Sequence, residues 1–244
     1  MKFSPSVEVI TFTYNESFYI DYLVKWYRAR FRNLTITVFD NYSTDDTVAK
    51  AQALGCKVET WGSPHKKIQV AFRDLKNSCF KNGESDFFLI CDIDELLDVS
   101  DADLVEHWPT VVRGVGYEMV GNEKTKLEEI RFGARSIFYD KCFLFRRDTV
   151  LEVNYNLGAH ACKPVFVDGH QVKEYLRRNL YHFRWLSLQF VSDRYERNAK
   201  RVSDSDRRNG YSSHYFKSSE EIASEFAEVQ NNSISLPVNW SPEI

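Results

Sequence analysis

A short apolar run that ends abruptly in carboxylates constrains this chain more than any other feature. Phe87 to Cys91 is apolar throughout, which is typical of a strand buried on both faces of a sheet. Asp92, Asp94 and Glu95 follow it directly. Because side chains alternate along a strand, Asp92 and Asp94 point to the same side, and two carboxylates there begin a site for Mg²⁺ or Mn²⁺. The alternative is that these acids cap a following helix.

The first half of the chain alternates the patterns of strands and helices. Strands are expected over residues 7–13, 34–39, 56–61 and 87–91, and helices over residues 16–31, 43–55 and 67–81. Strands separated by helices of this length form parallel sheets with right-handed crossovers. The sequence therefore predicts an α/β fold with a mainly parallel central sheet flanked by helices.

The second half has less regular patterns. Strands are expected over residues 114–120, 137–146, 161–167 and 181–185, and helices over residues 124–132, 188–201 and 219–230. Residues 231–244 are polar, contain Pro237 and Pro242, and are expected to form a loose tail.

Composition excludes several classes of protein. The net charge of −3 provides no basic field for nucleic acid. The five cysteines are widely spaced with no C-x-x-C pair, which argues against a zinc site and against a disulfide framework. Neither a signal peptide nor a run of 18 apolar residues is present. We therefore expect a cytoplasmic protein without a transmembrane segment, while peripheral contact with a membrane stays open.

Three loops follow three of the expected strands. They span residues 11–16, 39–45 and 92–95, and the carboxyl ends of parallel strands face one crevice. Tyr14 could stack on a base, or it is simply an aromatic at the rim. Asp40 could accept hydrogen bonds from a base or ribose, or it is a turn residue before a helix cap. Together with Asp92 and Asp94, these loops favour a site for a nucleotide diphosphate.

The motifs at these strand ends resemble those of family 2 glycosyltransferases with the GT-A fold, a Rossmann-like fold of nucleotide-diphospho-sugar transferases. Thr13-Tyr14-Asn15-Glu16 is similar to the first motif, and the acidic turn that begins at Asp40 is similar to the second. Asp92-Ile93-Asp94 resembles the DXD motif. Lys76-Asn77 matches a basic-Asn pair sixteen residues before it, where the family more often has Arg. The resemblance covers roughly the first 100 residues.

The resemblance implies an inverting transfer of a sugar from a nucleotide-diphosphate sugar to a glycan or other hydroxyl acceptor, and it favours a UDP-sugar as the donor. It implies that Tyr14 and Asp40 hold the base and that Asp92 binds ribose or metal. Asp94 would ligate the Mn²⁺ or Mg²⁺ that bridges the diphosphate. The residues that it places in the donor site are Phe12, Tyr14, Glu16, Asp40, Lys76 and Asp92. Phe12 stands where relatives often have a small polar residue, so uracil, guanine and thymine all stay open.

The second half of the chain should supply the catalytic base. Segments around Glu118, Asp140, His160 and His182 resemble those of a bacterial and viral subgroup of DXD glycosyltransferases. Asp140 is a candidate base, unless it forms a surface pair with Lys141; Glu118 and His160 are the others. His182 is the candidate third metal ligand, because a late histidine often joins the DXD metal in GT-A enzymes. A histidine hydrogen-bonded in the core is the alternative for His160 and for His182.

The resemblance and the absence of a linker imply one domain over residues 1–230. Residues 1–100 would bind the nucleotide, and residues 101–230 would bind the acceptor and carry the catalytic groups. A nucleotidyltransferase that makes nucleotide sugars is one alternative, although the Gly-rich basic loop of such enzymes is missing after the first strand. A non-catalytic module that binds nucleotide sugars or carbohydrates is another, although such a module does not need a metal-binding carboxylate pair.

Overall fold

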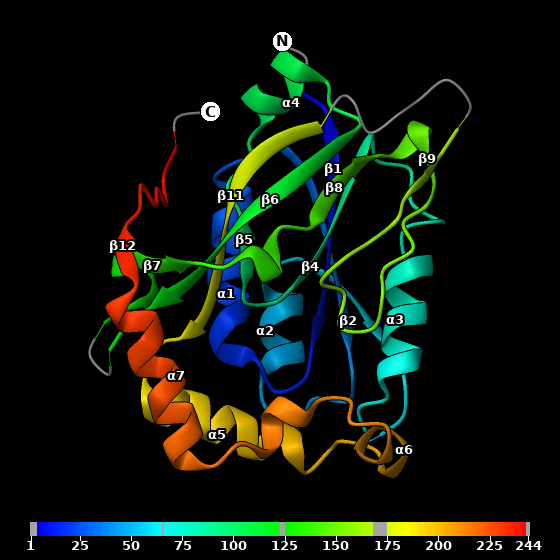
Figure 1. Cartoon of the computed structure of the whole chain (residues 1–244). Helices are drawn as coiled ribbons and strands as arrows, with labels where there is room; N and C mark the ends of the chain where they lie inside the picture. The colour runs from blue at the N-terminus through cyan, green and yellow to red at the C-terminus, as the bar shows by residue number, and fades with distance from the viewer. Residues whose placement is uncertain (1–3, 65, 123–124, 168–174, 243–244) are drawn as a thin grey trace.

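The computed structural model describes residues 4–64, 66–122, 125–167 and 175–242. Its first half is a parallel sheet in the order β4-β1-β2-β3 (Figure 1). The strands are β1 (Ser6–Thr13), β2 (Asn33–Asp40), β3 (Lys57–Thr60) and β4 (Phe87–Asp92). The helices between them are α1 (Ser17–Arg28), α2 (Thr47–Ala53) and α3 (Gln69–Ser78). The expected α/β alternation of this half is confirmed.

Helices cover both faces of this parallel sheet. On one face, Val7 and Val9 of β1 belong to the same buried cluster as Leu23 of α1 and Ala51 of α2. On the other face, Ile10 and its neighbours form a second cluster, against which α3 packs. Burial on both faces explains why β4 is apolar from Phe87 to Cys91.

The rest of the sheet is mixed. Its strands are β5 (Glu95–Leu97), β6 (Val111–Val120), β7 (Phe132–Arg135), β8 (Cys142–Arg146), β11 (Tyr175–Trp185) and β12 (Ser233–Ser235). β6 pairs with β11 in parallel, whereas β8 joins β4 to β6 through antiparallel pairing on both sides. A separate antiparallel hairpin consists of β9 (Val150–Glu152) and β10 (Val165–Phe166).

Four α-helices among the described residues of the second half complete the fold. They are α4 (Asp101–His107), α5 (Leu188–Ala199), α6 (Asp204–Arg208) and α7 (Ser219–Asn231). Figure 1 shows α5, α6 and α7 together at one end of the sheet, the end at which β1 and β4 terminate. No helix among the described residues is both long and apolar enough to cross a membrane.

Beyond β4, the structure excludes one of the open alternatives and differs from two of the expected elements. Asp92, Asp94 and Glu95 cap no helix, because the short strand β5 begins at Glu95 and pairs with β11. The helix expected over 124–132 is reduced, within the described residues, to a 3₁₀ turn at Leu127–Glu129. The strand expected over 137–146 begins with another 3₁₀ turn, η2 (Ile137–Tyr139), before β8.

The C-terminal residues do not form the expected loose tail. β12 pairs with β7, and Leu236, Val238 and Trp240 are buried. The ring of Trp240 lies 4.9 Å from the ring of Trp26 in α1. Alternating apolar side chains bury these residues even though the segment is polar on average.

Candidate functional site

A cavity of about 1060 Å³ lies at the carboxyl ends of β1 and β4. Its wall includes Tyr14 after β1, Asp92 and Asp94 after β4, His182 of β11 and Arg194 of α5. The two halves of the chain therefore contribute to one site, and two of the three expected loops meet there through several residues each. The middle loop contributes Asn41.

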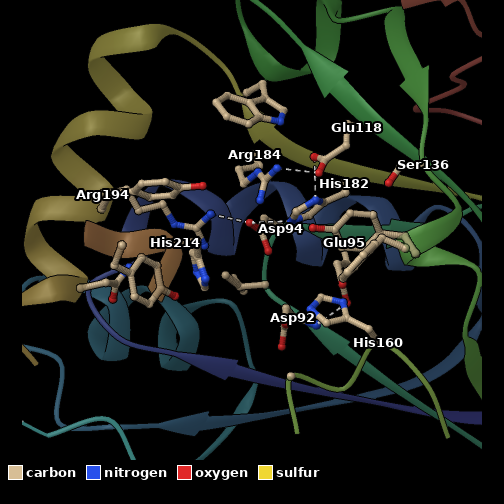
Figure 2. Close-up of a pocket in the computed structure, with 18 of the residues that line it drawn as sticks. Asp92, Asp94, Glu95, Glu118, Ser136, His160, His182, Arg184, Arg194 and His214 are labelled. Atoms are coloured by element: carbon tan, nitrogen blue, oxygen red, sulfur yellow. Dashed lines mark hydrogen bonds and ion pairs between the residues drawn. The ribbon is translucent and has the colours of Figure 1, made fainter. Parts of the chain in front are cut away.

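The centre of the cavity is a buried chain of ion pairs around Asp94 (Figure 2). Asp94 Oδ2 lies 2.5 Å from Arg194 Nη1 and 3.3 Å from His182 Nε2. The other ring nitrogen of His182, Nδ1, lies 2.9 Å from Glu118 Oε2, and Arg184 donates to Glu118 Oε1 at 2.8 Å. Each carboxylate is therefore paired with at least one cation.

In these ion pairs, the neighbouring charges shift the pKa values of Asp94 and His182 more than burial does. Burial alone would raise the pKa of Asp94, but Arg194 and His182 hold it well below its usual value. Burial alone would lower the pKa of His182, but Glu118 and Asp94 raise it to about 9. In this arrangement His182 is an imidazolium at neutral pH.

Two buried lysines form ion pairs with Asp92 and Glu95. Lys76 Nζ lies 2.6 Å from Asp92 Oδ1, and Lys141 Nζ lies 2.9 Å from Glu95 Oε1. Burial raises the pKa of Asp92, but Lys76 and Lys141 more than offset this effect and lower it to about 2. Lys76 thus contacts the DXD-like segment, although it lies beneath Asp92 and is not part of the cavity wall.

Glu16 lies in the cavity wall but is occupied by two arginines. Its Oε1 accepts hydrogen bonds from Arg194 Nε and from Arg197 Nη2, both at 3.0 Å. Burial raises the pKa of Glu16 despite these partners. Glu16 therefore holds Arg194 and Arg197 in place in this structure. Its predicted contact with the donor stays a prediction.

One end of the cavity is aromatic. Trp61 stacks on Phe72 with ring centroids 5.5 Å apart, and Phe12 meets Phe72 edge to face at 5.1 Å. Phe12 and Tyr14 were expected here, and the ring of Tyr14 lies 3.2 Å beneath the guanidinium of Arg201. The sequence analysis missed Trp61 and Phe72. A signal was present for Trp61, which directly follows a strand end that lies beside β2.

Asp40 does not lie in the cavity wall. Its carboxylate accepts hydrogen bonds from Thr13 Oγ1 at 3.1 Å and from the Ser43 backbone N–H at 2.9 Å. Asp40 is only 3% exposed. These hydrogen bonds match the turn-residue interpretation, while a contact between Asp40 and the base stays a prediction. The neighbouring Asn41 lines the cavity instead.

The two predicted catalytic residues differ in their placement. Asp140 lies outside the cavity wall, where its carboxylate binds the Gly116 N–H at 2.9 Å and Arg135 at 2.5 Å, so the geometry does not support a role as base. Its neighbour Lys141 is buried rather than forming a surface pair. His160 lines the cavity, and its Nδ1 has no hydrogen-bond partner among the described residues. Burial lowers the pKa of His160 to about 4, which keeps its imidazole neutral at pH 7.

The ligand types around Asp94 fit a divalent cation. Asp92, Asp94 and His182 offer oxygen and nitrogen ligands suited to Mn²⁺. The contact of His182 Nδ1 with Glu118 leaves Nε2 directed toward Asp94, an orientation typical of metal-bound histidine. Among the described residues no three His, Cys, Asp or Glu side chains form a complete site. A cation held by one or two carboxylates commonly takes its other ligands from substrate phosphates and water.

No model of a known protein family matches this sequence, and no curated protein matches it at a significant level. Solved structures that resemble the fold include residues 1–349 of S. aureus TarS, with 17% identity, 79% of this chain and 63% of that chain covered, and a TM-score of 0.43. The same TarS fragment with UDP-GlcNAc shows 15% identity, coverage of 91% and 71%, and a TM-score of 0.42. A mannosyltransferase from Pyrobaculum calidifontis, in complex with GDP-Man and Mn²⁺, shows 21% identity, coverage of 50% and 37%, and a TM-score of 0.34.

Proposed function

We propose that this chain is a glycosyltransferase of the GT-A type that transfers a sugar from a nucleotide-diphosphate sugar to a hydroxyl acceptor, with inversion. One observation carries the proposal. A single cavity joins an aromatic end, formed by Phe12, Trp61 and Phe72, to the paired carboxylates Asp92 and Asp94. An aromatic surface suits a nucleobase, and carboxylates at the end of a buried strand suit the metal-bound diphosphate beside it.

Asp92, Asp94 and His182 would hold Mn²⁺ or Mg²⁺ in this proposal. The ion, when bound, supplies positive charge for the departing diphosphate. Arg194 and Lys76, which contact Asp94 and Asp92, add fixed positive charge to the same region. A pre-oriented set of charges of this kind stabilises negative charge without reorganisation during the reaction.

His160 is the proposed acceptor of the proton from the attacking hydroxyl. Its imidazole is neutral at pH 7, and it lines the same cavity. Glu118 is less suited to this role, because His182 and Arg184 already occupy its two oxygens. A proton acceptor needs a free lone pair within about 3 Å of the hydroxyl.

The test is thermal unfolding with UDP-, GDP- and dTDP-sugars, each with and without Mn²⁺. A ligand that binds the native state raises the unfolding midpoint with its occupancy. We expect one nucleotide sugar to raise the midpoint in a metal-dependent way, and we expect Asp94→Asn to lose that shift. Asp74→Asn, which changes an exposed carboxylate of α3 outside the cavity wall, is the matched control and should keep it.

The alternatives make different predictions in the same assay. A nucleotidyltransferase would respond to a nucleoside triphosphate and, with a sugar 1-phosphate, would convert it to the nucleotide sugar with release of pyrophosphate. A binding module would respond to nucleotide sugars equally with and without metal, and it would catalyse no transfer. Either result would refute the proposal.

A further inference from the structure

The end of the cavity opposite the aromatic end lies between η2 and α7, and we refer to it as the α7 end. Four residues of one helical face line it, at positions i, i+3, i+4 and i+7: Glu225, Glu228, Val229 and Asn232. Ser136, which lies between β7 and η2, and Phe138 of η2 also line it. Asp94 and His182 belong to the wall of the same cavity and lie next to each other (Figure 2).

Buried hydrogen-bonding groups in this wall lack partners. Trp185 is 1% exposed and Tyr195 is 4% exposed, and both line the cavity. Neither Trp185 Nε1 nor the Tyr195 hydroxyl has a hydrogen-bond partner among the described residues. An unpaired buried polar group costs about 1–3 kcal/mol, so a ligand that offers hydrogen-bond acceptors here would gain from satisfying them.

The cations near this end are already paired. Arg184 binds Glu118 at 2.8 Å, Arg135 binds Asp140 at 2.5 Å, and Lys217 forms an ion pair with Glu225. Among the described ion pairs none includes Glu228, which is exposed on α7. The α7 end thus has no spare positive charge for a phosphate or carboxylate, and Glu228 would repel one.

An exposed aromatic ring completes the wall. Phe138 is 64% exposed, and its ring lies 4.9 Å from the ring of His160. The ring gives one apolar face beside the hydroxyl, amide and carboxylate groups of Ser136, Asn232 and Glu228. A pocket with an aromatic face and a few polar groups fits a ligand with an apolar ring face and many hydroxyls.

We propose that the α7 end binds the acceptor and that this acceptor is an uncharged sugar rather than an anionic one. That this sugar is the acceptor of the reaction rests on the proposed function. That an uncharged sugar binds at the α7 end does not depend on the proposed function. The hydroxyls of a sugar can accept from Trp185 and Tyr195 and donate to Glu228, and its ring can lie against Phe138.

Saturation-transfer NMR with two classes of probe tests this inference. The uncharged probes are the methyl glycosides of glucose, galactose and N-acetylglucosamine, and the anionic probes are glucuronate and glycerol 3-phosphate. We expect the native protein to bind at least one uncharged glycoside and neither anion. Phe138→Ala should weaken that binding about tenfold, because the apolar face is lost.

Charge reversal gives a second test in the opposite direction. Glu228→Lys should allow glucuronate to bind, since it replaces the repelling charge with an attracting one. Gln230→Lys is the matched control: it adds the same charge to an exposed position of α7 that is not in the cavity wall, and it should not admit glucuronate. Unfolding midpoints of all variants show whether they are folded.

Three results would overturn the inference: no uncharged glycoside binds, the anions bind the native protein equally well, or Phe138→Ala binds the glycoside as the native protein does. Failure of the proposed function is distinguishable from these. If nucleotide sugars do not bind but the glycoside does, with the expected losses, the carbohydrate site stands and the glycosyltransferase does not.

Discussion

The buried ion pair between Lys141 and Glu95 leads to the sharpest prediction about stability. Lys141 Nζ lies 2.9 Å from Glu95 Oε1, and the two side chains are 2% and 1% exposed. The other oxygen of Glu95 accepts the backbone N–H of Asp92 at 3.0 Å. Burial lowers the pKa of Lys141, but Glu95 and Asp92 outweigh it and raise the pKa above its usual value. The pair is therefore charged, and it ties the start of β8 to the residues after β4.

Lys141→Met keeps most of the side-chain volume but leaves the carboxylate of Glu95 buried without its partner. Removal of one member of a buried pair costs about 3–5 kcal/mol of unfolding free energy. For a chain of this length, about 2–4 °C of the unfolding midpoint corresponds to each kcal/mol, so the midpoint should fall by about 6–20 °C. Urea unfolding followed by circular dichroism measures the free energy directly.

Lys200→Met is the control for this experiment. Lys200 pairs with Glu196, and both side chains are 70% exposed, so its loss should change the free energy by less than about 0.5 kcal/mol. Glu95→Leu combined with Lys141→Met removes both charges and should recover most of the lost stability. Equal free energies for Lys141→Met and Lys200→Met would refute the reasoning.

Three further predictions concern the cavity. Arg194→Gln should raise the affinity for Mn²⁺ about tenfold or more, because Arg194 competes for Asp94, and titration of free Mn²⁺ by electron paramagnetic resonance measures it. An unchanged affinity would contradict it. Trp61→Ala should weaken nucleotide binding by about 1–3 kcal/mol in calorimetry if the base stacks there, and undiminished binding would place the base elsewhere. Stability should fall as the pH is lowered from 6.5 to 5. Burial lowers the pKa of His160 to about 4 and that of His214 to about 3, so both take up protons mainly in the unfolded state. His214→Gln should make this loss shallower in urea unfolding, and an unchanged slope would refute that assignment.

The fold of the first half could be predicted from sequence for physical reasons. Strands buried on both faces must be apolar, and β4 shows this over Phe87 to Cys91. The helix α2 is bounded by a run of polar residues and by Gly55, whose φ of 72° ends the helix with little strain. The strands of the second half are shorter or pair with distant segments, so local patterns constrain them less. β5 has three residues and is defined by its pairing with β11.

The cavity itself could be predicted only in part. Strand-end position brought Tyr14, Asp92 and Asp94 to one place, as expected from a parallel sheet. The position of a residue at a strand end does not show which groups its side chain contacts. The carboxylate of Asp40, for example, accepts hydrogen bonds from Thr13 and from the Ser43 N–H. No local sequence pattern predicts the ion pair between Arg194 and Asp94, which are 100 residues apart in the sequence.

Side chains from both halves of the chain meet within the site. Arg194 and Arg197 come from α5, yet they hold Glu16 of the first loop. Arg201 follows the same helix and lies over the ring of Tyr14. These guanidinium groups are buried or half-buried, and a carboxylate left without them would carry the full cost of desolvation. The residues after β1 therefore depend on the second half for their charge balance, and we expect substitutions in α5 to disturb binding at both ends of the cavity.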